Sequence, residues 1–137
     1  MLLETAMTLP LLLLVSVAIF ELATVYQAEQ VLTNAAREGA RLAILPNSSA
    51  ADIQSRVTQY LQAGQLPNSQ SATVTVTPNA VIAMGGTNVS ASIVTVNYPY
   101  QFTFLNPVAR LVVSGSTLGG APLMLTASAE MRNETQF

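Results

Sequence analysis

Residues 5–20 read TAMTLPLLLLVSVAIF and contain no charged side chain. At a rise of about 1.5 Å per residue, they would form a helix about 24 Å long. The hydrocarbon core of a bilayer is about 30 Å thick and needs about 20 apolar residues. The helix reaches that length by continuing through Glu21 to Tyr26. The stretch therefore predicts a helix that needs lipid or other helices around it.

This helix is expected to be retained in the mature protein. A removable signal peptide has basic residues before its apolar run and a small-residue cleavage site after it. Here the first charged residue is Glu4, and the helical pattern continues through Glu21. We expect one helix over residues 2–44, disturbed only around Pro10, because proline removes a backbone hydrogen bond.

The second half of the predicted helix has small residues on one face. Residues spaced three or four apart on this face are Leu32, Ala35, Ala36, Gly39, Ala40 and Ala43. Small side chains allow a neighbouring element to approach closely. The face is therefore expected to be a packing surface.

Residues 46–137 are predicted to form a small head, which makes the chain α+β with a division at residues 45 and 46. Ser49 and Asp52 have the spacing of a capping box and open a helix over residues 50–63. Asp52 and Arg56 are spaced for an i,i+4 ion pair. A second short helix is expected to start with Asn106 as its N-cap and Pro107 as its first residue.

Alternating apolar residues predict an antiparallel sheet in the head. Strands are expected over residues 72–77, 94–104 and 123–129, with Val74 and Val76 facing inward. The middle strand presents one register of large side chains, namely Val94, Val96, Tyr98, Tyr100, Phe102 and Phe104. We expect this register to be core, with a ligand platform as the alternative. Pro99 predicts an edge position or a bulge.

The composition excludes several classes of function. Charged residues make up 9% of the chain, against roughly 25% in ordinary soluble domains. The sequence has no Cys or His, so it offers no zinc-finger ligands, disulfides or Ser-His-Asp triad. A net charge of −2 argues against nucleic-acid binding. We expect no enzyme activity and no cofactor.

Charge is sparse in the middle of the chain, where Arg110 is the only charged residue between Val57 and Ala129. Such a neutral surface suits packing against copies of the same chain or exposure to an extracellular medium. A neutral β domain without a partner is the alternative.

Glu4 requires its own explanation, because a carboxylate in an apolar helix is costly unless it is paired. The nearest cation is the α-amino group of this chain or of a neighbouring copy. Alternatively, Glu4 is solvated at a water interface.

Both ends of the sequence resemble a known family. The stretches LETAMTLP at residues 3–10, Phe20-Glu21, and LTNAAREGAR at residues 32–41 are similar to the TadE/TadG-like group of type IV pilin-like proteins from tight-adherence systems. The strand leading to Tyr98 and Tyr100 and the closing AEMRNE at residues 129–134 are similar too. The resemblance implies a pilin-like fold with a long apolar helix and a small head.

The resemblance also implies a precursor cut by a prepilin peptidase just before the apolar helix, with Glu4 as the acid that follows the cut. The sequence has no basic leader ending in Gly, so we expect it to be the mature form. It implies an inner-membrane pool of subunits, an assembly machinery, and a helical homopolymer on the cell surface. The alternatives are a minor pilus component and a single-pass, membrane-anchored binding domain that does not polymerise.

Subunits of such a polymer would pack through the N-terminal helix. The residues expected to carry this packing are Glu4, Pro10, Leu11, Leu12, Leu13, Leu14, Phe20, Glu21, Ala36, Gly39, Ala40 and Ala43.

Overall fold

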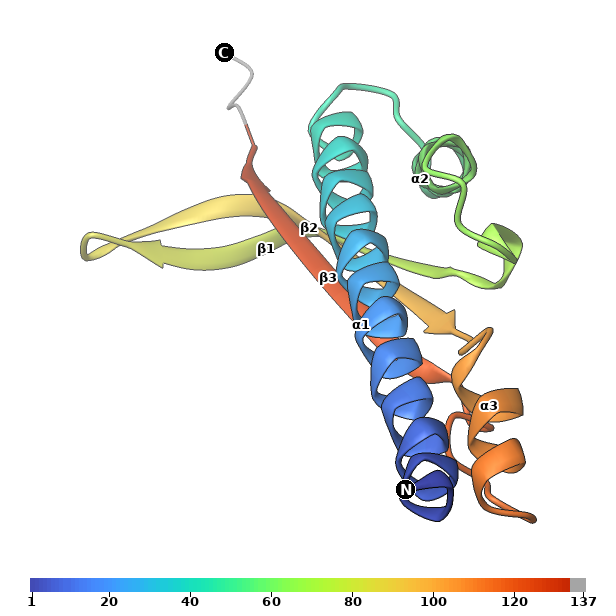
Figure 1. Cartoon of the computed structure of the whole chain (residues 1–137). Coiled ribbons are helices and arrows are strands. Elements are labelled where there is room, and N and C mark those ends of the chain that lie inside the picture. Colours follow the sequence, from blue (N-terminus) through green and yellow to red (C-terminus); the bar gives the residue numbers. More distant parts are fainter. Residues whose placement is uncertain (134–137) are drawn as a thin grey trace. The chain divides into compact units, whose positions relative to one another are not determined.

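A computed structural model describes residues 1–133 and has the expected α+β class. The elements in chain order are α1 (Leu2–Ala43), α2 (Ala50–Ala63), the 3₁₀ helix η1 (Ser69–Ser71), β1 (Thr73–Met84), β2 (Thr87–Tyr100), α3 (Leu105–Val112) and β3 (Leu123–Arg132) (Figure 1). Glu134, the last residue of the closing stretch noted in the sequence, lies outside the described residues.

The described chain forms two compact units. The first, which we call the apolar unit, contains Met1–Gln27 and Pro99–Met124. The second, which we call the head unit, contains Ala28–Tyr98 and the described residues from Leu125 onward. The units do not follow the sequence division at residues 45 and 46, because α1 contributes its first half to one unit and its second half to the other.

Helix α1 runs without a break from Leu2 to Ala43 and includes Pro10 (Figure 1). The prediction of one continuous N-terminal helix is therefore confirmed, and its end falls one residue before the expected Ile44. Good helix formers such as Ala, Leu, Gln and Glu dominate its sequence, which favours this long element.

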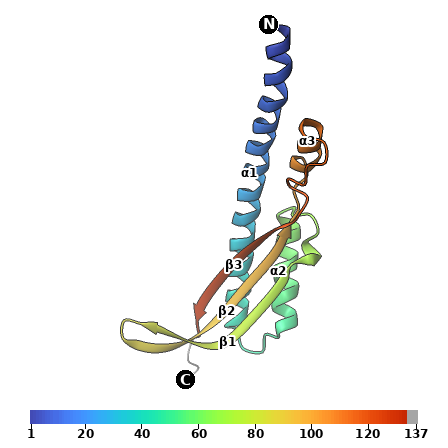
Figure 2. The ribbon, with the colours of Figure 1, turned by 90° about the horizontal axis from the view of Figure 1, so that it is seen from below.

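The head unit packs the second half of α1 and helix α2 on one face of the sheet (Figure 2). From α1, the fully buried residues are Ala28, Leu32, Ala35, Ala36 and Ala40. They meet a core whose other members include Ile53, Val57 and Leu61 from α2 and Val94 and Val96 from β2. The small residues of α1 therefore allow the helix to lie close to its own sheet.

Helix α2 has the predicted bounds and the predicted capping box. The Ser49 hydroxyl accepts a hydrogen bond from the Asp52 amide at 3.2 Å, and the Asp52 carboxylate accepts one from the Ser49 amide at 3.0 Å. The expected ion pair between Asp52 and Arg56 is wrong. Arg56 instead lies 3.1 Å from the Glu38 carboxylate, because Asp52 is already engaged by the cap.

The sheet has the order β1-β2-β3 and is antiparallel. Strands β1 and β2 form a long hairpin that closes at the Met84–Thr87 pair. Gly85 and Gly86 form its two-residue turn with φ angles of 56° and 86°, which glycine adopts without steric cost. The strand predicted over residues 72–77 therefore extends to Met84.

The aromatic register is only partly core. Tyr98 and Tyr100 are buried, but Phe102 is half-buried and Phe104 is exposed. The strand predicted to reach Phe104 is wrong beyond Tyr100, where β2 ends. Tyr98 donates a hydrogen bond to the Pro67 carbonyl, which satisfies its hydroxyl inside the head unit.

Two positions near the end of β2 differ from expectation. Pro99 lies in the central strand of the sheet rather than in an edge strand. Pairing with β1 reaches only Asn97, so the missing N–H of Pro99 leaves no hydrogen bond to β1 unmade. Helix α3 begins at Leu105, with Phe104 as its N-cap residue. Asn106 and Pro107 therefore lie within its first turn, where a backbone N–H has no partner within the helix.

Candidate functional site

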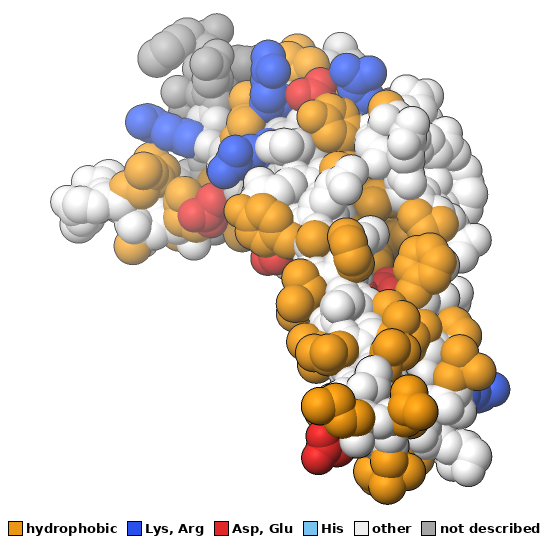
Figure 3. All heavy atoms as spheres, viewed as in Figure 1, with side chains coloured by type: hydrophobic (Ala, Val, Ile, Leu, Met, Phe, Trp, Pro, Cys, Tyr) orange, Lys and Arg blue, Asp and Glu red, His pale blue; other side chains and the backbone are white. Residues whose placement is uncertain are grey.

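The first half of α1 exposes a continuous apolar surface. Only 6% of its most apolar 18-residue window is buried, and the mean hydropathy of that window is 2.2. The exposed large side chains include Leu2, Leu3, Met7, Leu9, Leu11, Leu12, Leu13, Val15, Ile19, Phe20 and Leu22. Figure 3 shows apolar side chains gathered over the N-terminal part of α1 on the face in view. Within residues 1–133, α1 is the one helix long and apolar enough to cross a membrane.

This exposure is energetically significant because burying a Leu, Val or Ile side chain is worth about 1.5–3 kcal/mol. An apolar patch of this extent marks an interaction surface or a membrane contact. The helix length fits the second possibility, since the 19 residues from Leu2 to Phe20 span about 28 Å. That length is close to the roughly 30 Å of a bilayer core.

One stripe of this half-helix is covered within the apolar unit. Pro10, Leu14, Val17 and Ala18 are half-buried and are spaced as one helical face. Glu21 continues the stripe and is only 3% exposed. The other segment of this unit is Pro99–Met124, which contains α3. Of the apolar residues predicted to pack subunits, Pro10 and Leu14 are thus partly covered by the same chain, while Leu11, Leu12, Leu13 and Phe20 remain exposed.

The Glu21 carboxylate accepts more hydrogen bonds than any other charged group in the described structure. Its Oε1 accepts hydrogen bonds from the Tyr100 hydroxyl at 2.9 Å and from the Thr103 amide at 3.0 Å. Its Oε2 accepts bonds from the amides of Phe104 at 2.9 Å and Leu105 at 3.3 Å. Four donors therefore converge on one buried carboxylate.

This arrangement places a negative charge at the N-terminus of α3. The first N–H groups of a helix lack partners within the helix and carry partial positive charge. A buried carboxylate is costly without hydrogen bonds. Here the helix amides supply its donors, and the carboxylate supplies the acceptor that those amides lack within the helix. Glu21 thus fastens the start of α3 to α1 and acts as a positioning residue within its own chain.

Sequence reasoning named Glu21 as an assembly residue but did not identify these partners. The donors lie 79 to 84 residues further along the chain, and three of them are backbone amides, which have no residue-type signature. The available signal was a polar side chain at the boundary of an apolar helix, which demands a partner without naming it.

The remaining predicted assembly residues fall into two environments. Glu4 is exposed near the start of α1, and no residue among 1–133 pairs with its side chain. Ala36, Gly39 and Ala40 are buried in the head unit, and Ala43 is half-buried. A Cβ atom built on Gly39 would lie 2.8 Å from Val57 Cγ2 and 3.1 Å from Val94 Cγ1. Ala36, Gly39 and Ala40 therefore pack within their own head unit, and their part in subunit packing stays a prediction.

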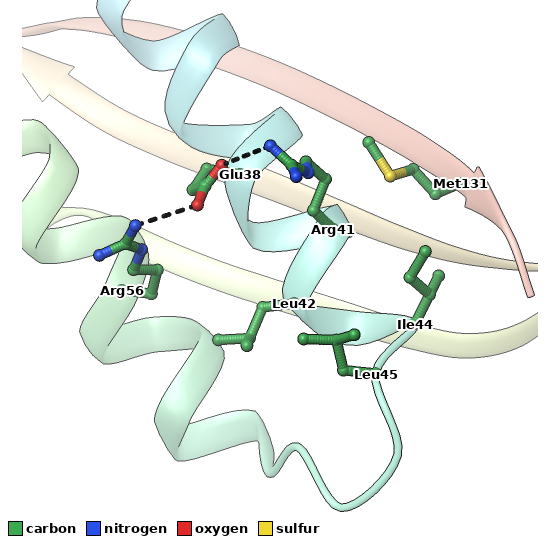
Figure 4. Close-up of a pocket in the computed structure, with 7 residues that line it drawn as sticks. All are labelled: Glu38, Arg41, Leu42, Ile44, Leu45, Arg56 and Met131. Atoms are coloured by element: carbon green, nitrogen blue, oxygen red, sulfur yellow. Dashed lines mark hydrogen bonds and ion pairs between the residues drawn. The ribbon is translucent and has the colours of Figure 1, made fainter.

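The head unit also has a surface depression of about 360 Å³ near the end of α1. Figure 4 shows Glu38 between Arg56 and Arg41, at 3.1 and 3.7 Å, and the depression is also lined by the apolar side chains of Leu42, Leu45 and Met131. Its arginines are half or more exposed, as expected for a solvated ion-pair cluster. No three acidic residues within positions 1–133 are grouped so as to hold a metal ion.

The N-terminal segment of the chain is similar to a known protein family. Residues 1–41 match the model of a family described as TadE-like protein. No curated protein and no solved structure matches the chain. The matched residues cover the exposed apolar half of α1, Glu21 and most of the buried small-residue face. Over this N-terminal segment, the match confirms the resemblance to TadE-like proteins that was read from the sequence.

Proposed function

We propose that the chain is a structural subunit of a type IV pilin-like filament that assembles through its N-terminal helix. The observation that carries this proposal is the exposed apolar half of α1 in a segment that matches the TadE-like family. Such a helix can leave lipid only for an equally apolar place, and a bundle of identical helices provides one. Head-to-tail contacts that do not close into a ring then build a filament.

The assembly surface in this proposal consists of the exposed side chains Leu11, Leu12, Leu13 and Phe20, with Glu4 at its start. Glu4 is ionised in the filament and pairs with the α-amino group of a neighbouring subunit. Breaking one side of such a buried pair typically costs about 3–5 kcal/mol. The pair therefore sets the axial stagger between subunits, because another register would leave both charges in an apolar environment.

The proposal places the chain first in the inner membrane and then in a filament on the cell surface. Its partners are other copies of itself, a prepilin peptidase and the pilus assembly machinery. It includes no enzymatic role, cofactor or nucleic-acid partner.

A second candidate is a minor pilus component or an anchored head that does not polymerise. The observation that favours it is the covered stripe of Pro10, Leu14, Val17 and Ala18. Because this stripe is half-buried within its own unit, fewer faces of α1 remain for other subunits.

Electron microscopy of material sheared from cells, with gold-labelled antibody against the head, distinguishes these candidates. Regular labelling along fibres, together with N-terminal sequencing of the sheared protein, is the expected result. Labelling at isolated points indicates a minor component. Recovery of the chain only in the membrane fraction contradicts filament assembly.

The Glu4→Gln variant tests the assembly mechanism. We expect normal synthesis and membrane insertion but a strong loss of sheared filaments, because the neighbouring ammonium loses its charged partner. Glu29→Gln is the matched control, since Glu29 is an exposed acid on the same helix. Wild-type filament yield from Glu4→Gln would show that Glu4 has no role in assembly.

A further inference from the structure

The segment that covers α1 in the apolar unit is itself apolar on its outer side. Its exposed large side chains are Phe104, Leu111, Val113, Leu118, Leu123 and Met124. Leu111 is 82% exposed, and Arg110 is the only charged residue in Pro99–Met124. We call the exposed side chains of residues 104–124 the α3 surface. It combines a broad apolar area with a single cation.

The α3 surface is continuous with the exposed apolar surface of the anchoring helix. Glu21 holds the start of α3 at the end of the segment Leu2–Phe20, and α3 lies beside the N-terminal half of α1 in both ribbon views (Figures 1 and 2). The eight residues of α3 extend about 12 Å. Amphipathic helices at a membrane surface are buried about 5–10 Å into the boundary between headgroups and acyl chains.

Several backbone polar groups around α3 have partners within the protein itself. Glu21 accepts from the amides of Thr103, Phe104 and Leu105 at the start of the helix. At its end, the Val113 amide donates to the Ala109 carbonyl at 2.8 Å.

Several groups of the loop that follows α3 also have partners within the protein. The Ser116 amide donates to the Val113 carbonyl at 3.1 Å, and the Gly120 amide donates to the Thr117 carbonyl at 3.0 Å. The Asn106 side chain donates to the Leu118 carbonyl at 3.0 Å. A lipid environment requires such internal partners because it supplies none.

We propose that the α3 surface is a second membrane contact, in which α3 lies among lipid headgroups and upper acyl chains at the bilayer boundary nearest Glu21. Leu111, Val113 and Phe104 contact acyl chains. The Arg110 stem lies along the apolar region while its guanidinium group reaches a lipid phosphate. This inference rests on the membrane anchoring in the proposed function and adds a second element to it.

Lipid is the occupant that fits both features of the surface. Acyl chains match an apolar area that continues from α1, and a phosphate matches the lone cation. The competing occupant is the apolar helix of a second copy, which would cover the same side chains but exclude lipid from them.

The absence of Trp from the sequence allows each site to be reported by one introduced Trp in the full chain. Three variants are needed, namely Leu111→Trp on α3, Phe20→Trp on the anchoring helix and Val81→Trp on the hairpin of the head unit. Each is reconstituted in vesicles of phosphatidylethanolamine and phosphatidylglycerol, with and without bromine on the acyl chains. Bromine quenches Trp emission only on contact.

The proposal expects Leu111→Trp and Phe20→Trp to lose emission in brominated vesicles to a comparable extent, while Val81→Trp is quenched only by aqueous iodide. Iodide quenching of Leu111→Trp with intact lipid quenching of Phe20→Trp would overturn the α3 contact and leave the anchor standing. Loss of lipid quenching at Phe20→Trp would overturn the anchor and the proposed function with it. Protection of Leu111→Trp from both quenchers would assign the surface to a second copy and overturn the lipid contact.

Discussion

Leu11 and Leu32 lie on the same helix, yet Leu11 is 58% exposed and Leu32 is completely buried. Around Leu32, α1 alternates large residues with Ala and Gly and packs against its own sheet and α2. Around Leu11, large aliphatic residues occupy successive positions on most sides of the helix. The first pattern specifies one close neighbour, whereas the second specifies only an apolar medium. One helix thus serves as a core element in the head unit and as an anchor in the apolar unit.

The two shorter helices show a related difference at their N-termini. Helix α2 is capped by Ser49 and Asp52, which are three residues apart. Helix α3 has no side-chain cap from its N-cap residue Phe104, and its first amides bind Glu21 from a distant part of the chain. Helix α2 therefore begins where its local sequence dictates, whereas the start of α3 depends on tertiary structure.

The largest expected effect comes from truncating a leucine in each half of α1. Leu32→Ala should lower the free energy of unfolding of the head unit by about 2–5 kcal/mol, as for other buried leucines. Leu11→Ala should leave that free energy nearly unchanged, because its side chain does not belong to the folded core. Denaturation of the full chain in detergent micelles, followed by circular dichroism, measures both.

Equal losses of unfolding free energy from Leu32→Ala and Leu11→Ala would contradict the distinction between a core half and an exposed half of α1. If Leu32→Ala lowers the free energy of unfolding only slightly, the residues of the small-residue face collapse easily into the cavity.

The second expected effect concerns the tie between α1 and α3. Glu21→Gln keeps the shape of the side chain but replaces one acceptor oxygen with a donor. Leaving a buried donor unpaired costs about 1–3 kcal/mol. We expect faster hydrogen–deuterium exchange at the amides of Thr103, Phe104 and Leu105, with no change at α2. Glu29→Gln, on the same helix but exposed, is the control and should change neither region.

Unchanged exchange at these three amides in Glu21→Gln would show that α3 is held by its apolar contacts alone. Tyr100→Phe sharpens the test, because it removes one of the four donors and leaves the carboxylate in place.

Sequence reasoning succeeded where the determining contacts are local. The bounds of α2 were predicted correctly because Ser49, Asp52 and Gly64 mark its ends within a few residues. The long α1 was predicted from its composition, and Pro46 follows closely after its end in the sequence. The extension of β1 to Met84 was not predicted, although the pair Gly85-Gly86 is typical of a two-residue hairpin turn.

Sequence reasoning failed where residues far apart in the chain determine where an element begins or ends. Asn106-Pro107 has the pattern of a helix start, but α3 begins earlier because Glu21 accepts its first amides. The alternation that runs to Phe104 continues after β2 has ended, since periodicity does not report where pairing stops. The small-residue face was read correctly as a packing surface, but the sequence does not state whether its partner is another subunit or the chain's own sheet.

A third, smaller effect tests the close packing of the buried half of α1. Alanine normally stabilises a helix by about 1 kcal/mol relative to glycine. At Gly39, however, the added Cβ would lie 2.8 Å from Val57 and 3.1 Å from Val94, and such overpacking typically costs about 1–3 kcal/mol. We therefore expect Gly39→Ala to lower the melting temperature of the head unit. A higher melting temperature would show that β-branched Val57 and Val94 can shift to accept a methyl group.

The smallest effect is the pH dependence of the local cap on α2. Hydrogen bonds from the Ser49 side chain and then the Ser49 amide lower the pKa of the Asp52 carboxyl below its ordinary value. Because the folded-state pKa is lowered, the stabilising contribution is present above the unfolded-state pKa of about 3.9. It is lost as the pH falls through the folded-state value.

Acid titration followed by amide exchange in the first turn of α2 should therefore show fraying below about pH 4. In Asp52→Asn this acid-dependent fraying should disappear, because the capping side chain no longer titrates. Fraying that persists in Asp52→Asn would show that the acid sensitivity does not come from the cap.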